Sequence, residues 1–369
     1  MILEEILVIV PRDGTMEINL RLRKVLDFAL DGVKNRYIRT AAELEQWFGT
    51  GGQAEKLCPS RRLLFAVSLG ETGINFEYYR ILRWLRENSG VLRGWAGGVI
   101  VDGTSELYTK SVARELVFTA NSAGCAFVGR PLVEGTESLD NFAIVAQNME
   151  TDHFTAYQKS SEILVKEILE FEPLKKEHPN LLVLHASSHK SSNTYALWNA
   201  VKEKLTGFEI TEIGLRNGTL SDCAGCPYKM CLHFGEQGSC FYGGVMVEDV
   251  YPAVRQADAI VMLCPNYNDA LSANLTAFIN RLTALFRTTR FYDKALFAIV
   301  VSGYSGSDIV AEQLIAALNM NKTFYLPGQF AMMETANNAG TAIRLPGIED
   351  RVRAFALRIE ETLRGLYRN

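Results

Sequence analysis

The stretch LLVLHASSHKSSNT, residues 181–194, decides the fold expected for the second half of the chain. Four aliphatic residues lead into a turn rich in hydroxyl, imidazole, amine and amide side chains, and a helical pattern begins at Tyr195. An apolar run followed by a polar turn and a helix is typical of a βα unit in a parallel sheet. Because free N–H groups and the positive dipole end at a helix start favour an anion, the turn predicts a phosphate site.

The same rhythm continues downstream of this unit. Runs such as AIVML (259–263) and LFAIVV (296–301) are apolar throughout, as expected for strands buried on both faces. The expected strands are 181–186, 208–213, 259–264, 295–302 and 323–326, and the expected helices begin at or cover 193, 247–256, 271–286, 308–318 and 348 onward. The pattern predicts an α/β fold with a doubly wound parallel five-stranded sheet.

The first half of the chain also reads as an α/β unit. Its expected strands are 6–10, 63–68, 97–103 and 125–129, with helices at 18–29, after 75 and at 107–120. Charges and prolines in 171–180 separate the halves, so we expect domains at 1–172 and 181–369. Residues 63–75 can be laid on 181–193, which suggests a diverged duplication or a chance likeness. Glu71 would then repel a phosphate, so the first domain is expected to bind no cofactor.

Composition excludes several classes of protein. A chain of 369 residues with 48% hydrophobic residues is long enough for two cores. The formal charge of −4 offers no basic surplus for nucleic acid or an anionic membrane. No apolar run is long enough to span a bilayer, and acidic residues precede the first apolar segment, which is unlike a secretion signal. We therefore expect a cytoplasmic protein whose partners are small molecules or proteins.

Three loops follow the first, third and fourth strands of the predicted C-terminal sheet. Each loop alone is more often a helix cap or a turn than a ligand site. Ligands of doubly wound sheets bind beyond the carboxyl ends of the strands, so the joint position of the loops predicts a phosphate cradle with two walls. The residues expected to contact the ligand are Ser187, His189, Ser191, Ser192, Asn193, Thr194, Pro265, Asn266, Tyr267, Asn268, Ser302, Gly303, Tyr304, Ser305 and Gly306.

These loops resemble those of the flavodoxin-like NADPH-dependent FMN reductase superfamily. The family's Gly-Ser-Pro-Arg and Asn-Thr correspond to 186–189 and 193–194, with His189 in place of the arginine. Its Ser-Pro-Val-Tyr corresponds to CPNY at 264–267, and its Leu-Lys-x-Phe-Ile-Asp-Arg to the helix SANLTAFINRL at 272–282. The resemblance implies that FMN binds on the three loops and accepts hydride from NAD(P)H, and that the protein forms a homo-oligomer. Catalytic side chains stay unknown, because hydride transfer to a flavin needs little from the protein beyond orientation. The resemblance also suggests that the N-terminal domain is a degenerate flavodoxin-like fold.

Four of the seven cysteines lie in an insertion at 221–243, namely Cys223, Cys226, Cys231 and Cys240. Such spacing suits a metal or redox site in a reducing compartment. Iron-sulfur flavoproteins, which this half resembles most, carry a compact cysteine motif for a [4Fe–4S] cluster after the second strand. Here three extra residues, Tyr228 to Met230, lengthen the spacing. An iron-sulfur cluster, zinc, free thiols and a disulfide therefore remain alternatives.

The sequence leaves three functions open. The first is an FMN-dependent NAD(P)H oxidoreductase that passes electrons to a small-molecule or protein acceptor. The second is a flavodoxin-type or iron-sulfur electron carrier without a nicotinamide site. The third is a flavodoxin-fold module without enzymatic activity, whose cofactor loops have lost their ligand.

Overall fold

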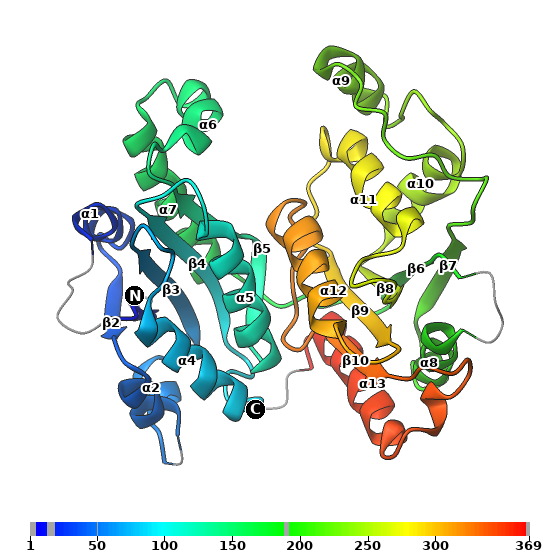
Figure 1. The fold of residues 1–369 in the computed structure, drawn as a ribbon, viewed down its shortest axis with the longest axis horizontal. Coiled ribbons are helices and arrows are strands. Elements are labelled where there is room, and N and C mark those ends of the chain that lie inside the picture. Colours follow the sequence, from blue (N-terminus) through cyan, green and yellow to red (C-terminus); the bar gives the residue numbers. More distant parts are fainter. Residues whose placement is uncertain (1–4, 13–18, 50, 188–191, 367–369) are drawn as a thin grey trace. The chain divides into compact units, whose positions relative to one another are not determined.

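The computed structural model describes residues 5–12, 19–49, 51–187 and 192–366. The chain forms two compact units, Met1–Glu172 and Pro173–Asn369, here called the N-terminal unit and the C-terminal unit. Each contains a five-stranded parallel sheet with helices packed against it (Figure 1). Among the described helices, none combines the length and the apolar character that a bilayer span requires.

The C-terminal sheet has the strand order β10-β9-β8-β6-β7. Its strands are β6 (Asn180–His185), β7 (Glu209–Gly214), β8 (Ala259–Pro265), β9 (Ala295–Ser302) and β10 (Ala331–Thr335). Its helices are α8 (Asn193–Lys202), α9 (Tyr228–Glu236), α10 (Tyr251–Gln256), α11 (Ala273–Phe286), α12 (Ser307–Leu314) and α13 (Ile348–Arg364), with shorter helical turns at Met246–Val250, Ile315–Met320 and Ala342–Arg344. Figure 1 shows α8 and α13 on one face of the sheet and α10 to α12 on the other. This confirms the predicted doubly wound fold.

The central strands explain why this sheet is predictable. Every residue of β9 is buried, and β8 is buried up to Cys264, because helices cover both faces. The chain runs outward from β6 to β7 and then returns to β8 on the other side of β6. The loops after β6 and β8 therefore diverge at the switch point of the sheet, where ligands of such folds bind.

The predicted fifth strand at 323–326 was wrong. That segment forms only an isolated bridge between Tyr325 and Ala295, and the fifth strand is β10, Ala331–Thr335. Phe324, Tyr325 and Leu326 are apolar because they are buried in the core. β10 is an edge strand in which buried and more exposed residues alternate, so it carries a weaker apolar signal.

The N-terminal sheet has the order β2-β1-β3-β4-β5, the same topology as the C-terminal sheet. Its strands are β1 (Glu5–Ile9), β2 (Lys34–Ile38), β3 (Arg62–Leu69), β4 (Ala96–Gly103) and β5 (Ala126–Gly135). Its helices are α1 (Leu20–Ala29), α2 (Ala41–Phe48), α3 (Ala54–Leu57), α4 (Phe76–Glu87), α5 (Thr109–Ser122), α6 (Ala143–Asn148) and α7 (His153–Leu169), with a helical turn at Asp140–Phe142. Both units are thus flavodoxin-like.

Strand β2 was missed from the sequence, and this error misaligned the two halves. β2 is the polar edge strand KNRYI, whose side chains are mostly exposed or half-buried. Without it, β3 was paired with β6, whereas the topology pairs β1 with β6 and β3 with β8. Glu71, which follows β3, therefore does not correspond to the turn after β6. The Glu71 carboxylate is thus no reason for this unit to lack a cofactor.

Candidate functional site

A cavity of about 360 Å³ lies at the carboxyl ends of the strands in the C-terminal unit. This is within the usual range for a small-molecule site. The loops after β6, β8, β9 and β10 all contribute to its walls. The lining residues are Ser187, Ser192, Asn193, Thr194, Pro265, Asn266, Tyr267, Val301, Gly303, Ala336, Asn337 and Ala339.

The structure brings most of the predicted ligand-contacting residues to this cavity. Eight of them line it: Ser187, Ser192, Asn193, Thr194, Pro265, Asn266, Tyr267 and Gly303. Asn268, Ser302, Tyr304, Ser305 and Gly306 lie in the same loops without being part of the lining. His189 and Ser191 lie outside the described residues.

The start of α8 presents hydroxyl groups to the cavity. Ser192 caps the helix, with its Oγ accepting the Tyr195 N–H at 3.5 Å. The Thr194 side chain is 1% exposed, and its Oγ1 lies 2.9 Å from Ser192 Oγ. Burial lowers the pKa of His185 at the end of β6, so this imidazole is neutral at physiological pH. Among these side chains, the hydroxyls and not a cation are the groups offered to an anion.

The Asn193 side chain connects the start of α8 to the loop after β10. Its Nδ2 donates to the carbonyls of Ala336 at 3.0 Å and Asn338 at 2.9 Å, and its Oδ1 accepts the Ala342 N–H at 3.1 Å. The side chain therefore ties the first turn of α8 to the loop after β10. Its amide is already used and is a poor candidate for direct phosphate binding.

Asn266 joins the loops after β8 and β9. Its Nδ2 lies 3.1 Å from Ser302 Oγ, 3.0 Å from the Ser305 carbonyl and 3.1 Å from Asp269 Oδ1. Its Oδ1 is buried and has no hydrogen-bond partner. A buried acceptor without a donor costs free energy, so a ligand N–H that reaches it would be stabilising.

Two tyrosines stand open beside this cavity. Tyr267 is 61% exposed and Tyr304 is 80% exposed. The Tyr304 hydroxyl accepts a hydrogen bond from Asn337 Nδ2 at 2.8 Å, which orients the ring. Large exposed aromatic faces next to a polar cavity suit the stacking of a flat aromatic ligand.

Gly306 is required by the geometry of these loops. Its φ is +85°, and a Cβ there would lie 2.1 Å from Asp269 Oδ1 and 2.9 Å from Asn266 Nδ2. We expect Gly306→Ala to lower the melting temperature of the protein and to weaken ligand binding, because the loops joined by Asn266 must separate. For the melting temperature, Gly303→Ala is the matched control, since its Cβ would meet only the Asn337 side chain, 3.2 Å from Oδ1. Equal melting temperatures for the two variants would contradict this interpretation.

The loop after β10 was missed from the sequence. It contributes Ala336, Asn337 and Ala339 to the cavity, and Val301 at the end of β9 was missed as well. The polar turn ANNAG at 336–340 was a usable signal. It was overlooked because the fifth strand was placed eight residues too early, between 323 and 326 instead of 331 and 335.

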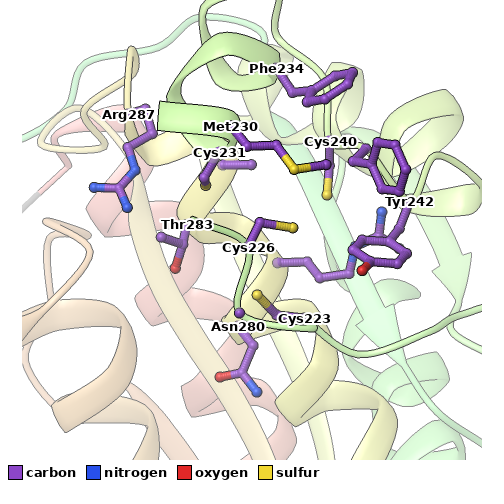
Figure 2. Close-up of a pocket in the computed structure, with 14 residues that line it drawn as sticks. Cys223, Cys226, Met230, Cys231, Phe234, Cys240, Tyr242, Asn280, Thr283 and Arg287 are labelled. Atoms are coloured by element: carbon purple, nitrogen blue, oxygen red, sulfur yellow. The ribbon is translucent and has the colours of Figure 1, made fainter. Parts of the chain in front are cut away.

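A second cavity, of about 220 Å³, lies in the cysteine segment, residues 221–243. All four cysteines line it, and Figure 2 shows their positions around it. The other lining residues are Gly225, Met230, Phe234, Phe241 and Tyr242 from the same segment and Asn280, Arg281, Thr283, Ala284 and Arg287 from α11 and its end. All seven cysteines of the chain are free thiols. Within the described ranges, no three His, Cys, Asp or Glu side chains are close enough to hold a metal ion directly.

Helix α9 accounts for the unusual cysteine spacing. Tyr228 to Met230, the residues that lengthen the spacing, form its first turn, and Cys231 follows on the same helix. A helix rises about 1.5 Å per residue, so three added residues add only about 4.5 Å along the axis. The longer spacing therefore does not carry Cys231 away from the other thiols.

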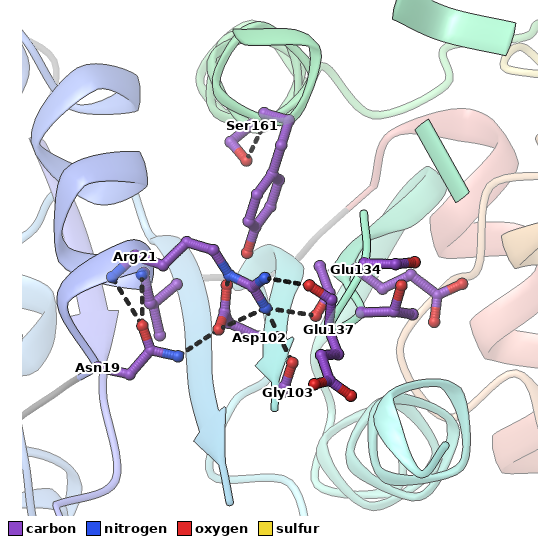
Figure 3. A network of polar contacts seen from close by, with 12 residues as sticks. Asn19, Arg21, Asp102, Gly103, Glu134, Glu137 and Ser161 are labelled. Atoms are coloured by element: carbon purple, nitrogen blue, oxygen red, sulfur yellow. Dashed lines mark hydrogen bonds and ion pairs between the residues drawn. The ribbon is translucent and has the colours of Figure 1, made fainter. Parts of the chain in front are cut away.

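The corresponding edge of the N-terminal unit is filled by an ion pair (Figure 3). Asp102, which is 0% exposed, accepts from Arg21 Nε at 2.9 Å and also from Asn19 Nδ2. Arg21 further donates to the carbonyls of Gly103 at 2.8 Å and Glu137 at 3.0 Å. By topology α1 corresponds to α8 and β4 to β9, the elements that line the cavity in the other unit. In this unit its own side chains occupy that edge.

The match to a family model agrees with this geometry. Residues 179–338 match the model described as NADPH-dependent FMN reductase. These residues belong to the NADPH-dependent FMN reductase family. The matched range of this reductase-family domain contains both cavities and all four loops at the carboxyl edge. The resemblance noted from the sequence is therefore confirmed.

The chain is also similar to individual proteins. The domain is similar to an iron-sulfur flavoprotein of Archaeoglobus fulgidus, with 28% identity over 150 residues that cover 39% of this chain and 74% of the relative. A crystal structure of RosB with bound 8-demethyl-8-formylriboflavin-5'-phosphate covers 51% of this chain and 80% of its own, at 14% identity and a TM-score of 0.40. An NAD(P)H:quinone oxidoreductase from Methanothermobacter marburgensis covers 52% and 96%, at 15% identity and a TM-score of 0.35.

Proposed function

We propose that the C-terminal unit binds FMN and that the protein is an FMN-dependent NAD(P)H oxidoreductase. The observation that carries this proposal is the convergence of four loops on one cavity at the switch point of the sheet. Hydroxyls at a helix start, a buried acceptor and open aromatic faces in one cavity match the phosphate, polar ring edge and flat ring of a flavin mononucleotide. Membership of the reductase family supports the same ligand.

Each part of the cavity has a role in this proposal. The phosphate lies against Ser187, Ser192 and Thr194 and the N–H groups of the first turn of α8. The Oδ1 of Asn266 accepts a hydrogen bond from the ring edge, and Tyr267 and Tyr304 flank the ring. FMN, when bound, supplies hydride acceptance from a nicotinamide and release of electrons to an acceptor. The chain itself needs only to orient the ring and to shield one of its faces.

We also propose that the four thiols of the cysteine segment hold a [4Fe–4S] cluster. A cavity of about 220 Å³ shared by four thiols is larger than a single zinc ion needs, because zinc lies about 2.3 Å from each sulfur. In a cluster the thiolates bind separate irons and stand farther apart. The similarity to an iron-sulfur flavoprotein supports the same occupant. The cluster would supply single-electron transfer at this site.

Substituting Thr194→Val tests the phosphate site. We expect the variant to bind FMN about tenfold to a hundredfold more weakly, since a hydrogen bond to a charged group contributes about 1.5–3 kcal/mol. Valine keeps the shape of the buried side chain, so apo stability should change little. Isothermal titration of the apoprotein with FMN and with riboflavin makes the measurement. Riboflavin lacks the phosphate, so its affinity should be the same in both proteins. An equal loss for both ligands would contradict this placement of the phosphate.

Steady-state kinetics separates the reductase from an electron carrier. The flavin-loaded reductase should oxidise NADPH or NADH with a quinone or ferricyanide as acceptor. A flavodoxin-type carrier would hold FMN and turn over neither nucleotide. A colourless preparation that takes up no FMN would instead favour the non-enzymatic module.

Three further features belong to this proposal. The electron acceptor is a small molecule or a protein, the protein assembles as a homo-oligomer, and the N-terminal unit binds no FMN. The filled edge at Asp102 and Arg21 supports the last of these. The Thr194→Val variant keeps Arg21, so titration of this variant with FMN should show no additional binding site in the N-terminal unit.

A further inference from the structure

Arg281 is an unusual residue at the wall of the cysteine cavity. It lies on α11, is 2% exposed and lines the cavity together with the four cysteines. The hydrogen bonds of its guanidinium go to backbone carbonyls and not to an Asp or Glu side chain of the described residues, and its buried Nε has no hydrogen-bond partner. A guanidinium stays charged at any physiological pH. Within the described residues, this buried positive charge therefore has no carboxylate in an ion pair with it.

The hydrogen bonds of Arg281 fix both ends of the cysteine segment. Its Nη2 donates to the carbonyl of Gly243 at 2.8 Å, and its Nη1 lies 3.5 Å from the carbonyl of Ser221. Those two residues are the first and last of the segment that carries the thiols. One side chain thus joins the beginning and the end of the segment to a helix of the sheet domain.

The neighbouring residue strengthens this anchor. Asn280 Nδ2 donates to Asp222 Oδ1 at 3.0 Å, and the same carboxylate oxygen accepts the backbone N–H of Cys223 at 2.7 Å. The carbonyl of Arg281 in turn accepts the buried Tyr251 hydroxyl at 2.6 Å. The position of Arg281 is therefore determined from both sides, and its guanidinium cannot leave the cavity wall without breaking this network.

A buried cation needs a compensating anion. Two carbonyl dipoles offset only part of the cost of removing a guanidinium from water. The groups that share the cavity with Arg281 are thiols, and an iron-sulfur cluster held by four thiolates carries a net negative charge. Arg287 also lines the cavity, but its guanidinium stacks on the Tyr228 ring at 4.7 Å. Arg281 is thus the cation best placed to face an anionic occupant.

We propose that Arg281 is a positioning residue of the thiol site, which clamps both ends of the cysteine segment and raises the reduction potential of an anionic cluster bound there. The proposal rests on the cluster proposed above. A fixed positive charge stabilises the reduced, more negative state of a cluster more than the oxidised state. The arginine therefore acts on the site in two ways, through geometry and through charge.

Three variants separate these two effects. Arg281→Lys keeps the positive charge but loses the two-pronged hydrogen bonding of the guanidinium, and Arg281→Met loses both. Arg290→Met removes an exposed arginine that does not line the cavity and serves as the control. Each protein is reconstituted anaerobically with iron and sulfide. Iron and sulfide per chain are measured, and the midpoint potential is obtained by redox titration followed through visible absorption.

The expected results differ among the variants. Arg281→Met should hold less iron, and its reduction equilibrium should shift at least tenfold toward the oxidised state, which is 59 mV for one electron. Arg281→Lys should hold less iron but keep a potential close to that of the wild type, and Arg290→Met should match the wild type in both. Should the methionine variant retain no iron, Arg281→Gln, which removes the charge but keeps hydrogen-bond donors, takes its place in the comparison of potentials with Arg281→Lys and the wild type.

Two failures can be told apart. A wild-type protein that takes up no iron and sulfide overturns the proposed cluster and this inference with it. A wild type with a cluster, combined with equal potentials in Arg281→Met and the wild type, overturns the role of Arg281 alone. Potentials displaced equally in the lysine and methionine variants would also overturn the charge effect.

Discussion

Removal of the Cys226 thiol is expected to abolish iron binding. After anaerobic reconstitution, Cys226→Ala should contain at least about tenfold less iron and sulfide than the wild type, since even the loss of an outer partner of a metal ligand costs about tenfold to a hundredfold. Cys226 is half-buried at the wall of the cavity, directly before α9. The FMN content of this variant should be unchanged, because the cavity at the carboxyl ends of the strands, where we propose that FMN binds, has no cysteine in its lining.

Cys125→Ala is the matched control for this experiment. Cys125 is a fully buried thiol of the N-terminal unit, and burial raises its pKa, so it is neither accessible nor nucleophilic. The control loses the same number of sulfur atoms and should keep the full iron content. Iron that is lost to the same extent in both variants would show general destabilisation instead of a missing ligand.

Breaking the ion pair of the N-terminal unit is expected to produce the largest change in stability. Arg21→Met leaves the Asp102 carboxylate, which is 0% exposed, without its cation. Removing one partner of a buried pair costs about 3–5 kcal/mol. Hydrogen exchange should therefore speed up by several orders of magnitude in α1 and β4, whereas peptides from β9 in the other unit should exchange at the wild-type rate.

The pH dependence of this effect has a defined sign. Burial raises the pKa of Asp102, and the Arg21 ion pair opposes that shift. In Arg21→Met the opposing contribution is gone, so the carboxyl gains a proton more easily when folded than when unfolded. A raised pKa means that stability is greatest at low pH and falls as the pH rises through the folded pKa. The penalty of Arg21→Met should therefore be smaller in acid than at neutral pH.

Two further variants test this explanation. Lys24→Met removes an exposed charge from the same helix and should change stability by less than about 0.5 kcal/mol. The double variant Arg21→Met with Asp102→Asn should recover part of the loss, because no uncompensated charge remains. A double variant that is less stable than Arg21→Met would show that the ion pair is not the source of the effect.

The sequence predicts those elements of the fold whose burial produces a run of apolar residues. Strands β8 and β9 are apolar along almost their whole length because both faces are covered, and both were located correctly. The edge strands β2 and β10 are half-exposed, so their polar residues concealed them. Helix α9 was missed because, of its 9 residues, only Gly235 is buried, so it has no buried apolar face to mark it as a helix.

The candidate site divides in the same way. The polar turn at 187–194 and the loop at 265–267 can each be recognised from a few consecutive residues. Ser187, residues 192–194 and residues 265–267 line the cavity. The ion pair of Arg21 with Asp102 joins residues 81 positions apart, and no local pattern encodes it. The clamp of Arg281 on Ser221 likewise spans 60 positions. Long-range polar contacts of this kind become visible only when the topology is known.

The packing of α9 has a consequence for how the thiol site is loaded. Gly235 lies so close to α11 that a Cβ there would be 2.7 Å from the Ala284 carbonyl, and the Thr288 hydroxyl donates to the Gly235 carbonyl at 3.3 Å. Contacts within the polypeptide thus hold this segment against α11. A zinc finger unfolds when a chelator removes its metal, whereas the cysteine segment should keep its fold when the proposed cluster is removed. Repeated extraction and reloading should therefore be reversible without refolding.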